Sequence, residues 1–221
     1  MNLETVITYM TLTVIGLLPM MNPPAAATVL LGLSKGRDKS YIVTQAKTVG
    51  VYLFIALCVT FFIGASVLEL FSISIPSLRL GGGIVILAIG FNMLFPKPEI
   101  ADARPGQDSI ALVPLTIPSL CGPGTMALII SLAAEIATYE NHESMISVYS
   151  GVIIGFLLVA LTAGFILSMA YPILKALGQN GINAFTRIMG FLLICMGVQF
   201  FTVGIEEIVI DLSLLLESSI H

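Results

Sequence analysis

Two short stretches decide the architecture: LPMMNPPAA at residues 18–26 and IPSLCGPGT at residues 117–125. Each places prolines beside an asparagine or glycines in the middle of a long apolar segment. Proline removes a backbone donor and clashes with the preceding turn, so each stretch is predicted to break a helix. The two breaks occupy corresponding places in the two halves of the chain, which predicts an internal repeat.

The sequence around the breaks is that of a membrane protein. Of the 221 residues, 57% are hydrophobic and 10% are charged, whereas a soluble domain has about 25% charged residues. A chain this apolar cannot cover itself with a water-facing surface, which excludes a soluble enzyme. The net charge of −4 and the lack of a basic face exclude a nucleic-acid binder. The chain is predicted to be an all-α polytopic membrane protein.

The apolar segments predict the number of spans, because a helix needs about 20 apolar residues to cross the hydrocarbon core. Six segments satisfy this length: 3–33, 41–71, 76–95, 110–134, 144–171 and 184–210. Each half, 1–95 and 110–221, therefore holds three spans, and 96–109 is a cytoplasmic linker. Because three is odd, the second half is predicted to enter the membrane in the opposite sense. This is the inverted-repeat arrangement of secondary transporters, with the first and fourth helices broken near the midplane.

The basic residues predict the orientation of these spans. Eight of the nine fall on one side of a six-span arrangement: Lys35, Arg37, Lys39, Lys47, Lys97, Arg104, Lys175 and Arg187. Most of the carboxylates fall on the other side, where Arg79 is the only basic residue. Both termini are therefore expected outside, in the periplasm.

The second break has the features of an anion site. Gly122 is a candidate N-cap and Pro123 a candidate first helical residue. The N–H groups of Gly124, Thr125 and Met126 would then be free, at the positive end of a half-helix dipole. Such an end suits a carboxylate.

The first break differs, because Pro23 and Pro24 remove two donors and leave those of Ala25 and Ala26. Asn22 is a candidate N-cap whose amide oxygen could accept a hydrogen bond from an ammonium group. The residues at both breaks are small, which favours a small zwitterion as ligand. The alternative is that small residues only allow close packing of helices.

Two polar pairs occupy matching places in the third and sixth spans. Asn92 and Gln199 are amides deep in apolar sequence, where they either complete the binding site or hold helices together. Arg79 and Arg187 stand at the starts of these spans, where a cation opposes the helix dipole. They are either gating residues that pair with loop carboxylates such as Glu69, or side chains that extend to the membrane surface.

No Asp or Glu falls in the centre of any predicted span, and His142 and His221 lie outside the span centres. Enzymatic activity, a metal centre and a bound cofactor are therefore not expected. Coupling to Na⁺ would use backbone carbonyls and hydroxyls, and coupling to protons would use a peripheral carboxylate.

Four motifs carry a resemblance to a known family: Asn22-Pro23, ISIPSLRLGGGIVILAIGFNMLFP, PLTIPSLCGPGT and NAFTRIMGFLLICMGVQF. Together they resemble the MarC family of integral inner-membrane proteins. The resemblance implies six spans and a bacterial inner membrane. It also implies kinship with archaeal carriers of small neutral amino acids such as glycine and alanine.

The leading interpretation is a secondary transporter of small neutral amino acids. Its expected partners are a small-molecule substrate and the lipid bilayer, and the sequence leaves a homo-oligomer open. One alternative is a transmembrane thiol relay, since Cys121 lies in the second break, although the first break offers no matching cysteine. Cys58 and Cys195 lie in apolar runs, where a small hydrophobic role is expected. Another alternative is a membrane scaffold that transports nothing.

Overall fold

A computed structural model describes residues 2–34, 36–95, 110–137 and 142–218. This part of the chain is helical almost throughout and contains no strand, as the sequence predicts. Its elements are α1 (Leu3–Met21), α2 (Pro23–Leu33), α3 (Lys39–Leu70), α4 (Ile75–Leu94), η1 (Ala111–Leu120), α5 (Pro123–Ala137), α6 (His142–Ser168) and α7 (Ala170–Ser218). The predicted linker 96–109, with Lys97 and Arg104, lies outside the described residues.

The described helices include fewer full-length spans than expected. Five are long and apolar enough to cross a membrane: α1, Lys39–Gly64 of α3, α4, Met145–Ser168 of α6 and Ala170–Ser213 of α7. The apolar helices α2 and α5 have only 11 and 15 residues. The predicted fourth span, 110–134, is not one helix, because η1 and α5 divide it. The all-helical fold is confirmed, and the six-span inverted repeat is not.

The segment η1 is an irregular, wide helix because of its prolines. Val113 and Ile117 each precede a proline and have extended backbone angles (φ −128°, ψ 125° and φ −121°, ψ 123°). Clash with the proline ring drives the preceding residue out of the helical region. The segment closes with hydrogen bonds that span five residues, such as the one from the Cys121 N–H to the Thr116 carbonyl at 2.8 Å. The distortion therefore begins well before the predicted break at 118–124.

The helix α7 is longer than the predicted sixth span. It bends at Gly178, whose φ of 64° lies in the region that glycine adopts most readily. The N–H groups of Met169 and Ile173 each bond to a carbonyl of the preceding turn at 3.0 Å, which leads α6 directly into α7. The expected connection between 171 and 184 therefore consists of helical turns on either side of a kink at Gly178, where the backbone is not helical.

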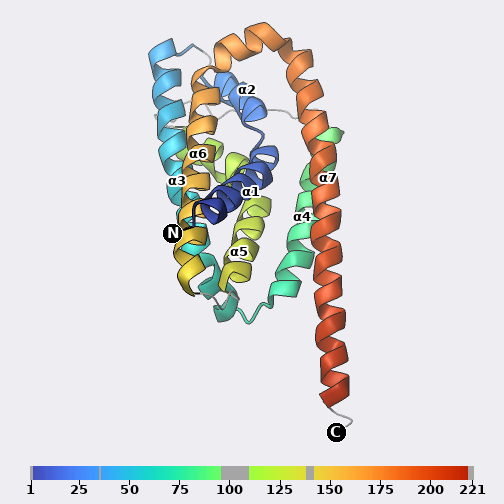
Figure 1. The fold of residues 1–221 in the computed structure, drawn as a ribbon. Helices are drawn as coiled ribbons and strands as arrows, with labels where there is room; N and C mark the ends of the chain where they lie inside the picture. The colour runs from blue at the N-terminus through green and yellow to red at the C-terminus, as the bar shows by residue number, and fades with distance from the viewer. Residues whose placement is uncertain (1, 35, 96–109, 138–141, 219–221) are drawn as a thin grey trace.

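The helices form two groups, called bodies here, that pack against each other (Figure 1). The larger body contains α1, α2, α3, η1, α5 and α6, whose buried side chains form one apolar core. The smaller body is the pair of α4 and α7, which stand beside each other along most of α4. A small cluster centred on Met20, Ile86 and Leu193 joins the two bodies. Each body takes helices from both predicted halves of the chain.

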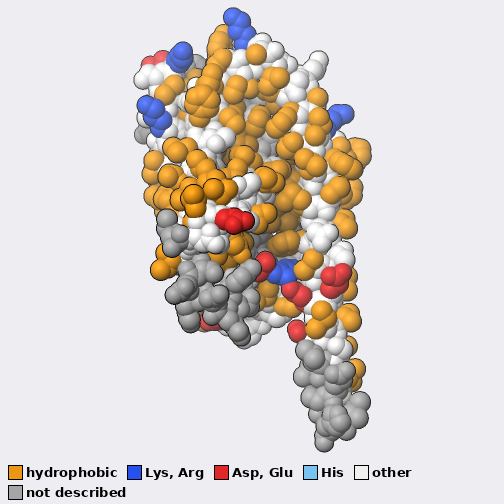
Figure 2. All heavy atoms as spheres, in the orientation of Figure 1, with side chains coloured by type: hydrophobic (Ala, Val, Ile, Leu, Met, Phe, Trp, Pro, Cys, Tyr) orange, Lys and Arg blue, Asp and Glu red, His pale blue; other side chains and the backbone are white. Residues whose placement is uncertain are grey.

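Charged side chains collect at the two ends of the molecule. Figure 2 shows Lys and Arg at one end, a broad hydrophobic surface in the middle and most Asp and Glu toward the other end. Arg79 lies among the acidic side chains. This is the charge separation that the sequence predicts. Which end faces the periplasm stays a prediction.

Candidate functional site

Asn22 alone forms the first break. It ends α1 and precedes α2 with left-handed backbone angles (φ 42°, ψ 64°), which asparagine tolerates better than most other residues with a side chain. Contrary to prediction, its side chain does not cap α2. The N–H groups of Ala25 and Ala26 both bond to the Asn22 carbonyl, at 3.0 and 3.2 Å. Because Pro23 and Pro24 have no N–H, the first turn of α2 offers no free donor.

The Asn22 side chain is directed into the protein and is only half satisfied. The residue is 5% exposed. Its Nδ2 donates to the Thr186 hydroxyl at 3.3 Å, whereas its Oδ1 has no hydrogen-bond partner among the described residues. A buried oxygen without a donor costs about 1–3 kcal/mol, which makes this atom a candidate acceptor for a ligand. Sequence reasoning missed Thr186, although it is a polar residue in the apolar NAFTRIMG motif.

The second break lies at Cys121 and Gly122, between η1 and α5. The Met126 N–H bonds to the Gly122 carbonyl at 3.0 Å and is not free, contrary to prediction. The N–H groups of Gly124 and Thr125 have no acceptor among the described residues. The Thr125 hydroxyl bonds back to a carbonyl of η1 at 3.2 Å. The positive end of α5 therefore presents two backbone donors instead of three.

The two breaks lie side by side, as predicted. A Cβ atom on Gly124 would be 3.8 Å from Cε of Met20, which stands two residues before Asn22. It would be 3.2 Å from Cδ1 of Ile89 in α4. Gly124 is buried among these apolar side chains, whereas the neighbouring Pro123 is exposed. The start of α5 thus packs against apolar side chains of α1 and α4.

Arg79 is the centre of an ion cluster between α4, α5 and α7. Its side chain is 11% exposed, its guanidinium donates to the Glu207 carboxylate, and it lies 3.7 Å from Glu135. Its Nε donates to the Ser131 hydroxyl at 3.0 Å. Of the two interpretations of Arg79, pairing with a carboxylate agrees with the structure, although the partners are Glu207 and Glu135 and not the loop residue Glu69 that served as the example. Glu207 belongs to a helix that the sequence does not place near Arg79.

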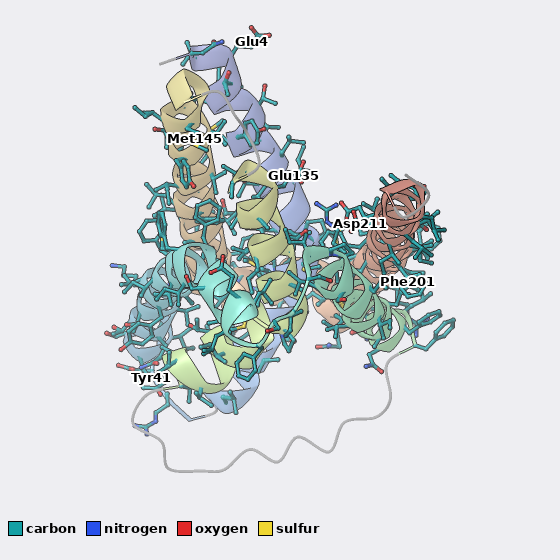
Figure 3. All side chains as sticks on the ribbon, turned by 90° about the horizontal axis from the view of Figure 1, so that it is seen from below. Glu4, Tyr41, Glu135, Met145, Phe201 and Asp211 are labelled. Carbon is teal, nitrogen blue, oxygen red and sulfur yellow. The ribbon has the colours of Figure 1, made fainter. Side chains whose placement is uncertain are left out.

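Cavities adjoin this cluster on both sides. One, of about 400 Å³, is mostly apolar and is lined by α1, α5, α6 and α7, with Arg79, Glu135 and Gln199 among its walls. The predicted residue Gln199 therefore lines the same cavity as Arg79. The other, also about 400 Å³, is bordered by Glu135, Glu207 and Asp211. Figure 3 shows Glu135 and Asp211 on facing sides of this space.

Two predicted residues stand apart from these features. Asn92 is exposed on α4 and lines neither of the two cavities. Arg187 is exposed on α7 and forms no ion pair with the described carboxylates. Arg187 is therefore not the equivalent of Arg79, and extension to the surface describes it better than gating.

The cysteines are all free. Cys121 is fully buried, Cys58 is half-buried and Cys195 is exposed. Thiol exchange needs an accessible sulfur, so the burial of Cys121 does not favour a thiol relay. Within the described ranges, no three His, Cys, Asp or Glu side chains are placed to hold a metal ion.

The chain matches a known protein family over almost its whole length. Residues 7–209 match the family described as "MarC family integral membrane protein", and this range includes both breaks and the Arg79 cluster. The chain belongs to the MarC family. The inner membrane protein MarC of Escherichia coli (strain K12) is 36% identical to it over 204 residues, 87% of this chain and 92% of the relative. The MarC protein of Shigella flexneri matches to the same extent.

Membership of the MarC family agrees with the five apolar helices. The chain is an integral protein of the inner membrane, and the resemblance noted from its motifs is confirmed. No solved structure matches the chain.

Proposed function

We propose that this MarC family protein is a secondary transporter of small neutral amino acids, of the size of glycine and alanine. The observation that carries the proposal is the buried Oδ1 of Asn22, which has no hydrogen-bond partner among the described residues. This oxygen would accept from the substrate ammonium. The N–H groups of Gly124 and Thr125 would donate to the substrate carboxylate. A zwitterion supplies both groups, and a simple cation or anion supplies one.

The small residues at the breaks favour a small substrate. Ala25, Gly122 and Gly124 contribute little volume, and Met20 and Ile89 close around Gly124. A large side chain on the substrate would have to displace these apolar groups. The proposed substrate therefore carries hydrogen or a methyl group beside its zwitterion.

The packing of the helices supports a transport mechanism in which one body moves against the other. Broken helices that meet beside each other are typical of secondary transporters. The α4–α7 pair meets the larger body where α4 packs on α5 and α7 packs on α2, and the Met20 cluster and the Arg79 cluster join the two bodies. Movement of one body against the other would expose the breaks to each side in turn. Arg79, held by Glu207 and Glu135, would gate the acidic end.

Counterflow in proteoliposomes tests this proposal. Purified protein is reconstituted, loaded with unlabelled alanine and given labelled alanine, glycine or serine outside, with and without Na⁺ and a pH gradient. Accumulation of label is expected for at least alanine and glycine. Asn22→Gly keeps a residue suited to the left-handed backbone but removes the amide, so it should weaken alanine binding about ten- to a hundred-fold.

Asn92→Ala is the matched control, because it removes an exposed amide away from the breaks. It should transport at the wild-type rate. Folded protein that accumulates none of the three amino acids would overturn the proposal and favour the scaffold interpretation. Equal losses in Asn22→Gly and Asn92→Ala would remove Asn22 from the site.

A further inference from the structure

A groove runs along the outer surface between α3 and α6, away from both breaks and from the Arg79 cluster. Its volume is about 480 Å³. Its apolar walls include Val51 and Phe54 from α3 and Leu157, Leu161 and Phe165 from α6. The two helices stand beside each other in the larger body (Figure 1). We call it the α3–α6 groove.

Small residues form the floor of the α3–α6 groove. A Cβ atom on Gly50 would lie 3.2 Å from the carbonyl oxygen of Ala160 and 3.7 Å from Cα of Gly164. The backbones therefore nearly touch at this depth. Larger side chains rise on both sides, and Val51, Leu161 and Phe165 are 59%, 60% and 64% exposed. The result is a furrow that is open along its length to the surrounding hydrocarbon.

The length of the groove corresponds to one leaflet. It extends along α6 from Leu157 to Ser168. At 1.5 Å per residue, this distance is about 16 Å. The hydrocarbon core of a bilayer is about 30 Å thick, so one leaflet contributes about 15 Å. An extended acyl chain therefore fits along the groove.

One end of the groove carries an unpaired positive charge. Lys47 lines the groove, is exposed, and lies within the apolar part of α3 that is long enough to span a membrane. No described carboxylate forms an ion pair with it. Ser168 lines the groove too, but its hydroxyl donates to the Phe165 carbonyl at 2.7 Å. Lys47 is thus the charged group available to a ligand.

A lysine within a membrane span needs an anionic partner or has to extend to the surface. Arg37 and Lys39 stand at the start of the same helix on either side of Asp38, so the net charge at this end of the groove is positive. A negatively charged headgroup at the Lys47 end of the groove would pair with this lysine, and its acyl chain would reach the other end of the groove.

We propose that the α3–α6 groove binds one anionic phospholipid, with an acyl chain in the furrow and the phosphate on Lys47. The proposal does not depend on transport. It assigns Lys47 to lipid recognition and the glycines of α3 and α6 to the shape of the lipid site.

Native mass spectrometry of the purified full-length protein tests the proposal. The protein is exchanged into an equal mixture of phosphatidylglycerol and phosphatidylcholine and then stripped of lipid in steps. One phosphatidylglycerol should survive longest. Lys47→Gln should weaken its binding about ten-fold, and Lys47→Arg should retain it. Lys175→Gln, which removes an exposed lysine of α7 outside the groove, should leave retention unchanged.

Two further arms separate the acyl chain from the headgroup. Glycerol 3-phosphate, which has the phosphate without the chain, should displace no lipid. Leu161→Trp should fill the furrow and lower retention of both lipids; if this variant does not fold, the Lys47 series decides alone. The proposal would be overturned if the two lipids were retained equally, or if Lys47→Gln retained phosphatidylglycerol as well as the wild type. It would also be overturned if glycerol 3-phosphate displaced the lipid, or if a second copy of the chain covered the groove.

Discussion

Gly83 and Gly197 bring the backbones of α4 and α7 into direct contact, since a Cβ atom on Gly83 would lie 2.9 Å from the Gly197 carbonyl oxygen. Gly90 and Gly190 make the same kind of contact seven residues along each helix. A Cβ atom on either glycine would lie 2.8 Å from the carbonyl oxygen of the other. The close approach explains how two helices can form a body of their own. Backbone contact of this kind is typical of small residues at membrane helix interfaces.

Gly83→Val is expected to separate these helices. The added side chain would meet backbone atoms of Gly197 and Phe201, which cannot move aside as a flexible side chain would. Overpacking of this kind typically costs about 1–3 kcal/mol. Gly81→Val is the control, because a Cβ there has no neighbour within 4 Å. Thermal unfolding in detergent should show a lower midpoint for Gly83→Val only, and equal shifts would contradict the contact.

The pair of Arg79 and Glu207 should stabilise the junction of α4 with α7. A double-mutant cycle with Arg79→Met and Glu207→Gln is expected to give a coupling energy of about 0.5–3 kcal/mol. The free energy of unfolding in a denaturing detergent series measures it. Glu206→Gln removes the adjacent, exposed carboxylate and should show no coupling with Arg79→Met. A coupling energy of zero for Glu207 would show that the contact contributes nothing.

The backbone of Asn22 predicts an unusual order of substitutions. Alanine at a left-handed position costs about 1–2 kcal/mol, whereas glycine adopts it freely. Asn22→Ala should therefore be less stable than Asn22→Gly, which is the reverse of the order found inside a helix. Both variants lose the contact with Thr186 equally, so the difference in their unfolding midpoints reports the backbone alone. The reverse order would rule out a left-handed residue at the break.

The two ends of the proposed site can be told apart with a ligand that lacks a carboxylate. Gly124→Val places methyl groups where the N–H groups of Gly124 and Thr125 would meet the substrate. It should weaken binding of alanine more than binding of alaninamide. Gly32→Val, in the open surroundings of α2, is the control for a valine in place of a helical glycine. An equal loss for both ligands would place the carboxylate elsewhere.

Labelling of single cysteines tests the predicted orientation of the protein in the membrane. In a variant without Cys58, Cys121 and Cys195, a cysteine at Glu206 should react with an impermeant thiol reagent added to whole cells. A cysteine at Lys175 should react only after permeabilisation, because basic residues mark the cytoplasmic side. External labelling at Lys175 would reverse the predicted topology.

Local chemistry made the breaks predictable from the sequence. Proline disrupts the hydrogen bonds of the helix that contains it, so Asn22-Pro23 and Gly122-Pro123 predict a break without knowledge of any distant contact. The same rule applies to Pro114, and its effect on Val113 could have been read from the sequence as well.

Distant partners were not predictable in the same way. Glu69 stands ten residues before Arg79 and Glu207 stands 128 residues after it, yet the structure selects Glu207. The choice depends on the packing of α4 against α7, which no local pattern encodes. The side-chain contact of Asn22 with Thr186 depends on the same placement of α7.

The single left-handed residue between α1 and α2, Asn22, sets the angle at which α2 leaves α1. The helix α2 has 11 residues and is about 16 Å long, so a difference of about 10° in this angle would displace its far end by about 3 Å. That end leads through Ser34 toward the basic start of α3. Because Ala26 and Leu30 of α2 are buried in the core of the larger body, packing fixes the angle at Asn22 and with it the place where the chain enters α3.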